Sequence, residues 1–520
     1  MQSKWWTLIT VNVAVFMLLL DITVVNVALP DIERSLDASF TDLQWVVDAY
    51  TLGLAALLLA AGSLADRLGR RRVFVAGLGL FTIASLLCAL AGSPTALNLA
   101  RALQGLGGAA MFATSLALLA QEFSGPERGT AFGVWGATTG GAVAVGPLVG
   151  GALTESLGWE SIFLLNLPIG IAAVVLTLRH VRESSDPQAG RLDLAGTALF
   201  SAALLALVLA LIRGNDEGWG SALIVGLFAT AALLLLAFVM VERRRSQPML
   251  DLSLFRISTF TGASAVAFAL SASMFAMFLY ITLYLQGVLG YSPLEAGMRF
   301  LPITLLSFLI APIAGRLSSR LPARGFLAGG LALVALGLFL MSGLDRDSSW
   351  TALLPGFVLA GAGIGLVNPP LASTAIGVVE PRRSGMASGI NSTFRQVGIA
   401  TGIAALGAVF QARIESRAGE LLVQPPETGS EFTVYAPIGS AEELGQAISS
   451  GAGGRIVASA PPEMRETLDA LVSEAFVSGL NTIFLIAAAV AAAGALLAFA
   501  LVRSRDIVEA PHAAAADAAV

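Results

Sequence analysis

Apolar stretches of about 20 residues recur along the whole chain, and this is the length that an α-helix needs to cross the hydrocarbon core of a bilayer. Fourteen such segments can be placed in the 520 residues. We expect them at 5–29, 42–65, 73–91, 95–120, 130–153, 161–180, 193–213, 220–241, 260–285, 297–316, 325–343, 351–374, 385–411 and 476–502. Charged residues make up only 12% of the chain, about half the share in a soluble domain. The sequence therefore predicts an all-α membrane protein, and it argues against a soluble enzyme, a disordered chain or a nucleic-acid binder.

The arginines are unevenly divided between the loops on the two sides of these segments. With the N-terminus inside, sixteen arginines fall on the cytoplasmic side and only four in the short outer loops. Positively charged loops favour the cytoplasmic side. An even number of spans places both termini on one side. We predict a membrane protein with both termini inside the cell.

A weak internal repeat indicates two related halves. The stretch GSLADRLGRRR at 62–72 joins the second and third spans, and a degenerate echo, GRLSSRLPAR at 315–324, joins the tenth and eleventh. Transporters are often built from duplicated halves. The predicted units are a six-helix bundle at 1–190, an inserted helix pair with a cytoplasmic linker at 191–258, a second six-helix bundle at 259–505 and a disordered tail at 506–520.

Residues 412–475 form the one long connection, on the outer side before the last span. Ten acidic residues against four arginines give this segment a net charge of −6. A solvated loop with one amphipathic helix near 461–475 would account for it. The alternative is an outer lid, or an acidic funnel that concentrates cations.

Three charged residues lie well inside predicted spans of the first half of the chain, where charges are costly and usually functional. At 1.5 Å per residue, Asp21, Asp48 and Arg101 lie in one layer ~10–13 Å below the outer surface. A carboxyl group removed from water can exchange a proton near neutral pH, and a neighbouring arginine tunes that exchange. We predict a proton relay. The alternative is a permanent Asp48–Arg101 ion pair that only holds the helices together.

Other polar and aromatic residues inside the spans are candidates for lining a substrate cavity. The ninth span is rich in aromatic and methionine side chains, which suit flat apolar ligands, and the thirteenth carries a polar cluster. The candidates are Asn26, Gln104, Trp135, Met277, Tyr280, Tyr284, Asn391, Arg395 and Gln396. Packing within the core, or hydrogen bonding between helices, is the alternative for the aromatic residues and for the polar cluster.

Two glycine-rich stretches predict moving or tightly turning parts. In GGAVAVGPLVGG at 140–151, small residues allow close helix approach and a proline bends the helix, which suits a seam between moving halves or simply close packing. In GSLADRLGRRR, glycines permit a tight turn, an aspartate can cap a neighbouring helix and arginines anchor the loop inside. The residues concerned are Gly62, Asp66, Arg67, Gly69, Arg70, Gly146, Pro147, Gly150 and Gly151. One cysteine and two histidines offer no recognisable metal site, and we expect no metal and no cofactor.

Taken together, these motifs resemble the fourteen-helix drug–proton antiporter family of the major facilitator superfamily. The resemblance is carried by LDITVVNVALP at 20–30, WVVDAYTL at 45–52, GSLADRLGRRR at 62–72, RALQGLGGAA at 101–110, GPLVGG at 146–151, SIFLLNLPIG at 161–170, SPLEAGMRFLP at 292–302 and NSTFRQVGIATG at 391–402. It implies the major facilitator fold, with two inserted helices, and no cofactor other than the proton gradient. It also implies alternating-access export of hydrophobic, often cationic drugs or antibiotics, with Asp21 as the leading proton site.

The resemblance leaves the substrate open. MRFLPITLL in the tenth span lacks the acid that family members handling divalent cations carry, so monovalent or neutral substrates are expected. A dedicated exporter of one natural product or lipid of the host is the first alternative, and a nutrient importer or facilitator is the second. No nucleophile–base pair points to an enzyme. The expected partners are the lipid bilayer and small hydrophobic or cationic substrates, with no nucleic acid and a monomeric protein.

Overall fold

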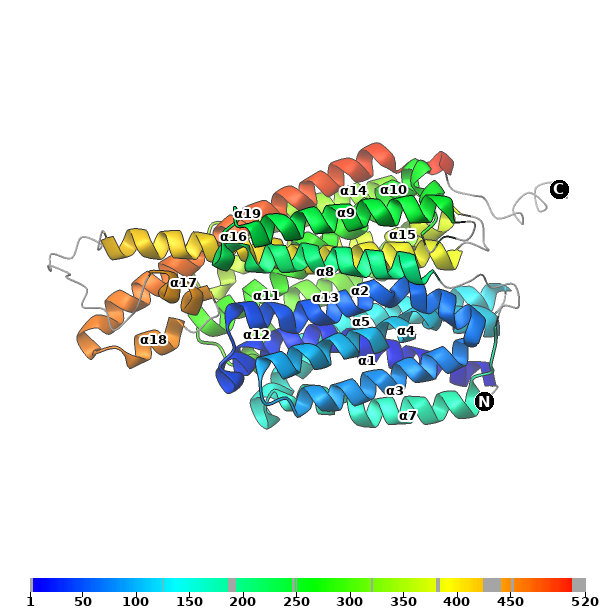
Figure 1. The fold of residues 1–520 in the computed structure, drawn as a ribbon, viewed down its shortest axis with the longest axis horizontal. Helices are drawn as coiled ribbons and strands as arrows, with labels where there is room; N and C mark the ends of the chain where they lie inside the picture. The colour runs from blue at the N-terminus through cyan, green and yellow to red at the C-terminus, as the bar shows by residue number, and fades with distance from the viewer. Residues whose placement is uncertain are drawn as a thin grey trace.

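The fold is a long bundle of roughly parallel and antiparallel helices (Figure 1). The computed structural model describes residues 3–123, 125–185, 193–245, 248, 250–318, 321–379, 384–423, 441–449 and 453–506. Every secondary-structure element assigned within these ranges is a helix. The helix that begins the chain and the helix that closes it reach the same end of the bundle (Figure 1), which we call the terminus end; the opposite end is the far end.

The first bundle contains the first six predicted spans. Its helices are α1 (Ser3–Leu36), α2 (Phe40–Leu68), α3 (Arg70–Ala89), α4 (Pro94–Glu122), α5 (Gly125–Leu157), α6 (Glu160–Leu164) and α7 (Asn166–His180). Local sequence signals determine where several of these helices begin. Ser39 and Asp42 form a reciprocal capping box at α2. At α4, Ser93 caps the helix and Pro94 occupies its first turn.

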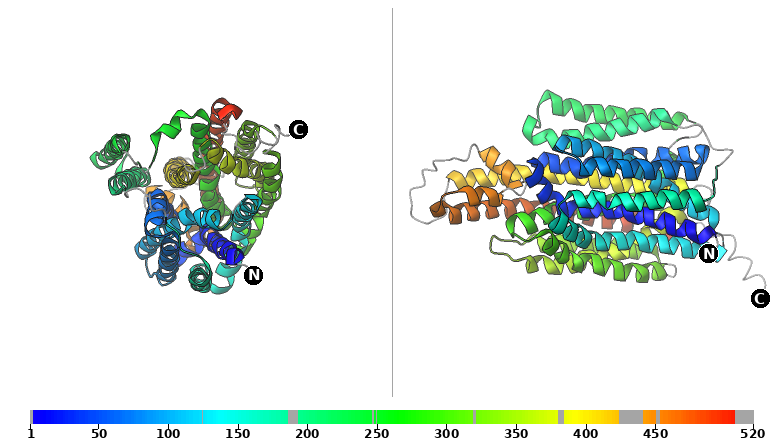
Figure 2. Two further views of the ribbon diagram at one scale, coloured as in Figure 1. Left: turned by 90° about the vertical axis from the view of Figure 1, so that its right-hand side faces the viewer. Right: turned by 90° about the horizontal axis from the view of Figure 1, so that it is seen from below.

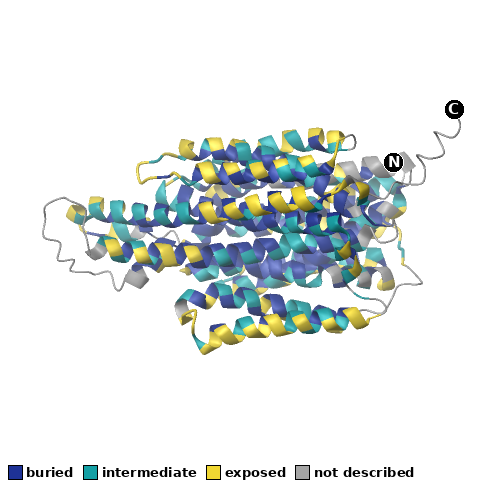
Figure 3. Ribbon diagram, turned by 90° about the horizontal axis from the view of Figure 1, so that it is seen from above, coloured by how far each residue is buried: buried dark blue, intermediate teal, exposed yellow. Residues whose placement is uncertain are grey.

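A separate helix pair follows and lies along one edge of the molecule (Figure 2). It consists of α8 (Leu194–Glu217) and α9 (Ala222–Arg244), which pack on each other, while α8 also packs on α2 and α16. The outer surface of α9 is apolar. Leu223, Leu233 and Leu236 are exposed, as expected of a helix whose surroundings are lipid. Figure 3 shows buried, intermediate and exposed residues over the whole molecule.

The second bundle contains the remaining six predicted spans. Its elements are η1 (Leu252–Arg256), α10 (Ser258–Leu270), η2 (Ser271–Phe275), α11 (Ala276–Leu283), η3 (Tyr284–Val288), α12 (Pro293–Arg299), α13 (Leu301–Ser318), α14 (Ala323–Met341), η4 (Trp350–Leu353), α15 (Leu354–Gly377), α16 (Ser384–Val423) and α19 (Pro462–Leu501), followed by η6 (Ser504–Asp506). Residues 507–520 of the predicted tail lie outside the described residues.

The predicted long connection is more helical than expected at both of its ends. Helix α16 continues twelve residues past the predicted end of its span, and the expected amphipathic helix near 461–475 is not separate but forms the start of α19. Two short helices, α17 (Ala441–Ser449) and α18 (Gly453–Ser459), pack beside them at the far end (Figure 1). Arg417 of α16 pairs with Glu474 of α19, which ties the two extensions together.

Every one of the fourteen predicted segments coincides with a helix. Within the part of the chain that the structure describes, twelve helices are long and apolar enough to cross a membrane. Helices α2 and α5 contain residues whose side chains lie outside the described set, so their lengths as spans are not tested. The membrane-spanning character of the protein rests on these twelve helices. The count of fourteen spans stays a prediction.

The described hydrogen bonds between the two bundles include a group near the far end. Gln286 of η3 donates to the carbonyl of Val27 in α1 at 2.7 Å. Ser292, which caps α12, donates to Glu155 of α5 at 2.7 Å. Gln44 of α2 donates to the carbonyl of Ile403 in α16 at 3.3 Å. These bonds hold the bundles together on the side away from the termini.

Candidate transport site

A buried ion pair occupies the centre of the first bundle. Nη1 of Arg101 in α4 lies 2.5 Å from Oδ2 of Asp21 in α1, and the two side chains are only 2% and 1% exposed. Gln104, one turn further along α4, donates to the other oxygen of Asp21 at 2.8 Å. The two charges therefore cancel within the bundle, and the carboxylate accepts bonds on both of its oxygens.

Two further residues complete this polar cluster, and the sequence reasoning did not single them out. Asn166 at the start of α7 donates to Asp21 at 2.9 Å. Ser85 of α3 accepts from Gln104 at 2.9 Å. Both are isolated polar residues in apolar runs, which was the available signal. Asp21 thereby connects four helices: α1, α4, α7 and, through Ser85, α3.

Aromatic rings and the backbone enclose Arg101. Its guanidinium lies 4.4 Å from the centre of the Tyr50 ring and 5.7 Å from that of Phe163. Its Nε donates to the carbonyl of Val46 at 2.9 Å. These contacts desolvate the charge and strengthen its interaction with Asp21. The alternative of a permanent Asp48–Arg101 ion pair is wrong, because Arg101 pairs with Asp21 and meets α2 at the Val46 carbonyl and the Tyr50 ring rather than at Asp48.

Asp48 lies in a different environment, although it shares the predicted depth. It is completely buried, and neither carboxylate oxygen has a hydrogen-bond partner among the described residues. It lies on α2, one turn from Gln44, which bonds across to the second bundle. A buried carboxyl group without partners is costly when charged. Asp48 is thus the acid of the first bundle whose carboxylate no described donor stabilises.

The polar cluster of the second bundle is built around one arginine. Arg395 of α16 hydrogen-bonds Asn368 of α15, a residue that the sequence reasoning did not single out, and both side chains are partly exposed. Asn391, one turn earlier, is buried and donates to the carbonyl of Ala263 in α10 at 3.3 Å. Gln396 keeps a buried oxygen without a hydrogen-bond partner among the described residues. Asn391 therefore contributes to helix packing, whereas Arg395 keeps part of its surface accessible.

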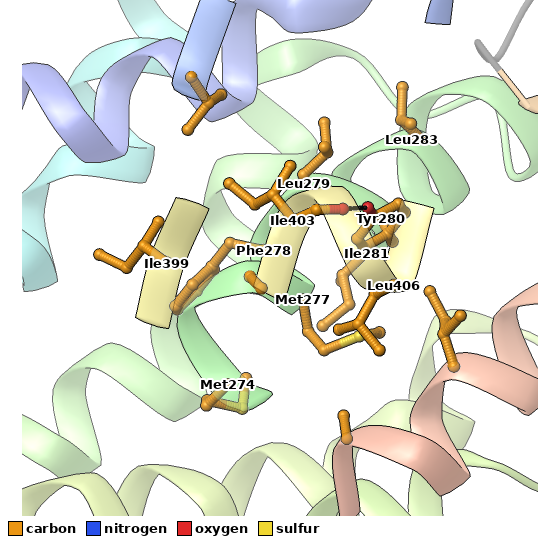
Figure 4. Packing of buried hydrophobic residues seen from close by; sticks show 14 of the residues in the cluster. Met274, Met277, Phe278, Leu279, Tyr280, Ile281, Leu283, Ile399, Ile403 and Leu406 are labelled. Atoms are coloured by element: carbon orange, nitrogen blue, oxygen red, sulfur yellow. Dashed lines mark hydrogen bonds between the residues drawn. The ribbon is translucent and has the colours of Figure 1, made fainter. Parts of the chain in front are cut away.

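The aromatic and methionine candidates of the ninth span are core residues in this structure. Met277 and Tyr280 are completely buried and Tyr284 is 1% exposed. Figure 4 shows Met277 and Tyr280 packed among apolar side chains, with the Tyr280 hydroxyl donating to the carbonyl of Ile403 at 2.6 Å. Their assignment to an open cavity lining is not supported here, because close packing leaves them no accessible surface.

The two remaining cavity candidates lie in the first bundle. Asn26 of α1 is partly exposed and donates to the carbonyl of Ile22 in its own helix at 3.1 Å. Trp135 of α5 is also partly exposed, and its ring centre lies 5.6 Å from that of Phe112 in α4. Both keep surface that a ligand could contact.

The GPLVGG stretch of α5 lies where three helices meet. Gly146 and Gly150 face Thr23 and Val24 of α1 so closely that a Cβ atom at either position would collide with them. Those collisions explain why glycine is required there. Pro147 presents its carbonyl to Gly297 of α12, which belongs to the second bundle. The stretch predicted to be a seam therefore touches both the first bundle and its partner.

The GSLADRLGRRR motif at 62–72 contacts an acidic residue that the sequence analysis did not predict. Gly69 adopts a φ of 109°, which favours glycine, and leads directly into α3. Glu183, from the segment after α7, accepts from the backbone N–H groups of Arg71 at 3.0 Å and Arg72 at 3.2 Å. A carboxylate at a helix N-terminus is favourable.

The other predicted members of this motif add less. Gly62 lies within α2, with open space beside it, rather than in the turn, and Arg67 is exposed. Arg70 begins α3, and its backbone N–H donates to the carbonyl of Ser184 at 2.8 Å. The side chain of Asp66 lies outside the described residues. Its predicted capping role therefore stays a prediction.

No group of acidic, histidine or cysteine side chains among the described residues could hold a metal ion. Two helical bundles, bonded to each other near one end and carrying buried charges at mid-depth, define a membrane transporter. Residues 11–403 match the model of the Major Facilitator Superfamily. The chain belongs to this family.

Relatives with known names are bacterial. The chain is 41% identical to "Multidrug resistance protein Stp" of Mycobacterium tuberculosis (strain CDC 1551 / Oshkosh) over 412 residues, 79% of this chain and 76% of that protein. It is 33% identical to the "Tetracenomycin C resistance and export protein" of Streptomyces glaucescens over 497 residues, 95% of this chain and 91% of that protein.

A solved structure shares the fold. An inward-facing, unoccupied bacterial homologue of the human lysosomal transporter Spinster superposes with a TM-score of 0.60 at 17% identity, and the match covers 98% of this chain and 99% of that one. At this identity the likeness concerns the fold alone. It agrees with the two-bundle arrangement described above.

Proposed function

We propose that the protein is a proton-coupled exporter of hydrophobic drugs or antibiotics in the bacterial cytoplasmic membrane, with both termini inside the cell. Relatives named for multidrug and antibiotic resistance support the substrate class. The observation that carries the coupling is the buried Asp21–Arg101 pair. In this orientation the far end faces outward, and its inter-bundle bonds hold the protein closed to the exterior.

The geometry of the pair suggests how a proton and a movement of helices are linked. A proton on Asp21 cancels its attraction for Arg101 and removes an acceptor from Gln104 and Asn166. Four helices would then lose their common partner. Helix α1, which carries Asp21, also carries the Val27 carbonyl that bonds Gln286 of the second bundle. Protonation at the cluster can therefore weaken the closure at the far end.

Asp48 supplies a second proton-binding group at the contact between the bundles. Both of its oxygens lack partners among the described residues while the far end is closed, so a charge on this carboxyl group has no compensation there. Opening of the α2–α16 contact would expose the group to water outside the cell, the side from which an exporter that exchanges protons for drug takes its proton. The two acids thus differ in the closed arrangement: Asp21 accepts bonds from Arg101, Gln104 and Asn166, and Asp48 accepts none from the described side chains.

The test is collapse of an imposed pH gradient in inverted vesicles that contain the protein, with ethidium as the added drug. We expect proton release on addition of ethidium. An Asp21→Asn variant, matched for expression, should show none, because its cluster no longer holds an exchangeable proton. Full drug-driven proton release by Asp21→Asn would remove Asp21 from the mechanism.

A second candidate is dedicated export of one compound made by the host. It is favoured by the resemblance to the tetracenomycin C exporter, which covers more of this chain than the multidrug relative does. Proton release with ethidium would favour the multidrug function. If none of a panel of unrelated drugs caused release, the dedicated function would be favoured.

A further inference from the structure

The second bundle contains a positive charge that nothing in its own membrane-spanning helices balances. Arg395 lies eleven residues from the start of α16, about 16 Å from the terminus end and near the middle of a bilayer. The sequence places no Asp or Glu at 258–288, 301–318, 323–341, 354–377, 384–411 or 476–501. The arginine is therefore the sole charge at mid-depth in this bundle.

The carboxylates of the first bundle do not balance Arg395 either. Asp21 is taken by Arg101, Gln104 and Asn166. Asp48 is completely buried, and its carboxylate accepts no hydrogen bond from any described residue. The acceptor that the described residues offer Arg395 is the neutral side-chain oxygen of Asn368. An unbalanced charge at this depth is expensive, and such charges usually serve a function.

Arg395 is also able to reach a ligand. A guanidinium has five N–H donors arranged to match the two oxygens of a carboxylate, and Asn368 occupies only part of this set. Both side chains are partly exposed, in contrast to the completely buried Asp48. Asn368 orients the arginine without cancelling its charge.

We propose that Arg395 and Asn368 form a subsite for an acidic group on the substrate, such as a carboxylate or a phenolate. The inference rests on the proposed drug-export function and adds to it. Hydrophobic compounds that carry one ionised acid would enter with the acid directed at Arg395. Their export would depend on that residue more strongly than the export of their uncharged or cationic analogues.

The test uses two dyes that differ only at the relevant group. Rhodamine 110 carries a free carboxyl group, and rhodamine 123 is its methyl ester. Export of each is measured from cells that express the wild-type protein, Arg395→Gln or Arg395→Lys. Arg324→Gln is the matched control, because Arg324 is a partly exposed arginine of the same bundle that lies in the first turn of α14.

We expect the wild type to export both dyes. Arg395→Gln should lower the ratio of rhodamine 110 export to rhodamine 123 export at least tenfold, and Arg395→Lys should restore much of it. Arg324→Gln should leave the ratio unchanged. Loss of both dyes in equal proportion would assign Arg395 a structural role and overturn the proposal, as would wild-type export of the ester alone.

Failure of the proposed function would look different. It would show as wild-type protein that exports neither dye and releases no protons with ethidium or other drugs. Proton release with ethidium together with an unchanged dye ratio in Arg395→Gln would keep the export function and reject only the acid subsite.

Discussion

The two bundles bury their charges in opposite ways. In the first, Arg101 meets a carboxylate, and four helices contribute to a cluster in which every charge has a counterpart. In the second, the partner that the described residues give Arg395 is the amide of Asn368. In our proposals the first arrangement responds to a proton, and the second is completed by an acidic group on the substrate. The proposed difference separates proton coupling from substrate recognition within one family fold.

The largest expected effect tests whether the two arginines really differ. Arg101→Gln leaves Asp21 as an uncompensated buried charge, which should lower the free energy of unfolding by about 3–5 kcal/mol. Arg395→Gln removes one bond to a neutral partner and should cost at most about 1 kcal/mol. Thermal unfolding of both purified variants in detergent compares them directly. Equal shifts in the midpoint of thermal unfolding would contradict the difference between the two arginines, because they would show that Arg395 has a strong partner within the protein.

A smaller effect is expected from the two asparagines that accompany these arginines. Asn166→Ala removes a donor from the charged Asp21 and should cost about 1.5–3 kcal/mol. Asn368→Ala leaves Arg395 partly accessible to water and should cost about 0.5–1.5 kcal/mol. The same unfolding measurement ranks the pair. A greater loss for Asn368→Ala would mean that the second bundle depends on its polar pair for stability.

The smallest expected effect concerns Asp48. Because its carboxylate makes no described bond, Asp48→Asn should leave the unfolding midpoint unchanged or raise it slightly. Asp21→Asn, the matched variant in the same bundle, should lower the midpoint by several degrees, because it leaves Arg101 unpaired. A drop of similar size for Asp48→Asn would reveal a partner for Asp48 and would remove it as a proton-binding group of the closed arrangement.

The pattern of the sequence predicted the helices well, because the length of an apolar run is a local property. All fourteen predicted segments are helical. The burial of Asp21 and Arg101 within the bundle could also be predicted, since a charge in an apolar run stands out without knowledge of its neighbours. An apolar or aromatic residue does not stand out in an apolar run. The sequence therefore could not tell whether Met277, Tyr280 and Tyr284 are buried in the core or line a cavity.

The partner of each charge was decided only by the tertiary structure. Depth along the helices put Asp21, Asp48 and Arg101 in one layer, but depth does not say how each helix is rotated about its axis or which helix lies beside it. Arg101 turned toward α1, and Asp48 was left without a bond among the described residues. Asn166, Asn368 and Glu183 contact Asp21, Arg395 and Arg71, which lie in other parts of the chain. The sequence by itself determined which groups must be buried, because burial follows from hydrophobic length. Which groups meet depends on packing between helices that are far apart in the sequence, and a local pattern holds no information on that.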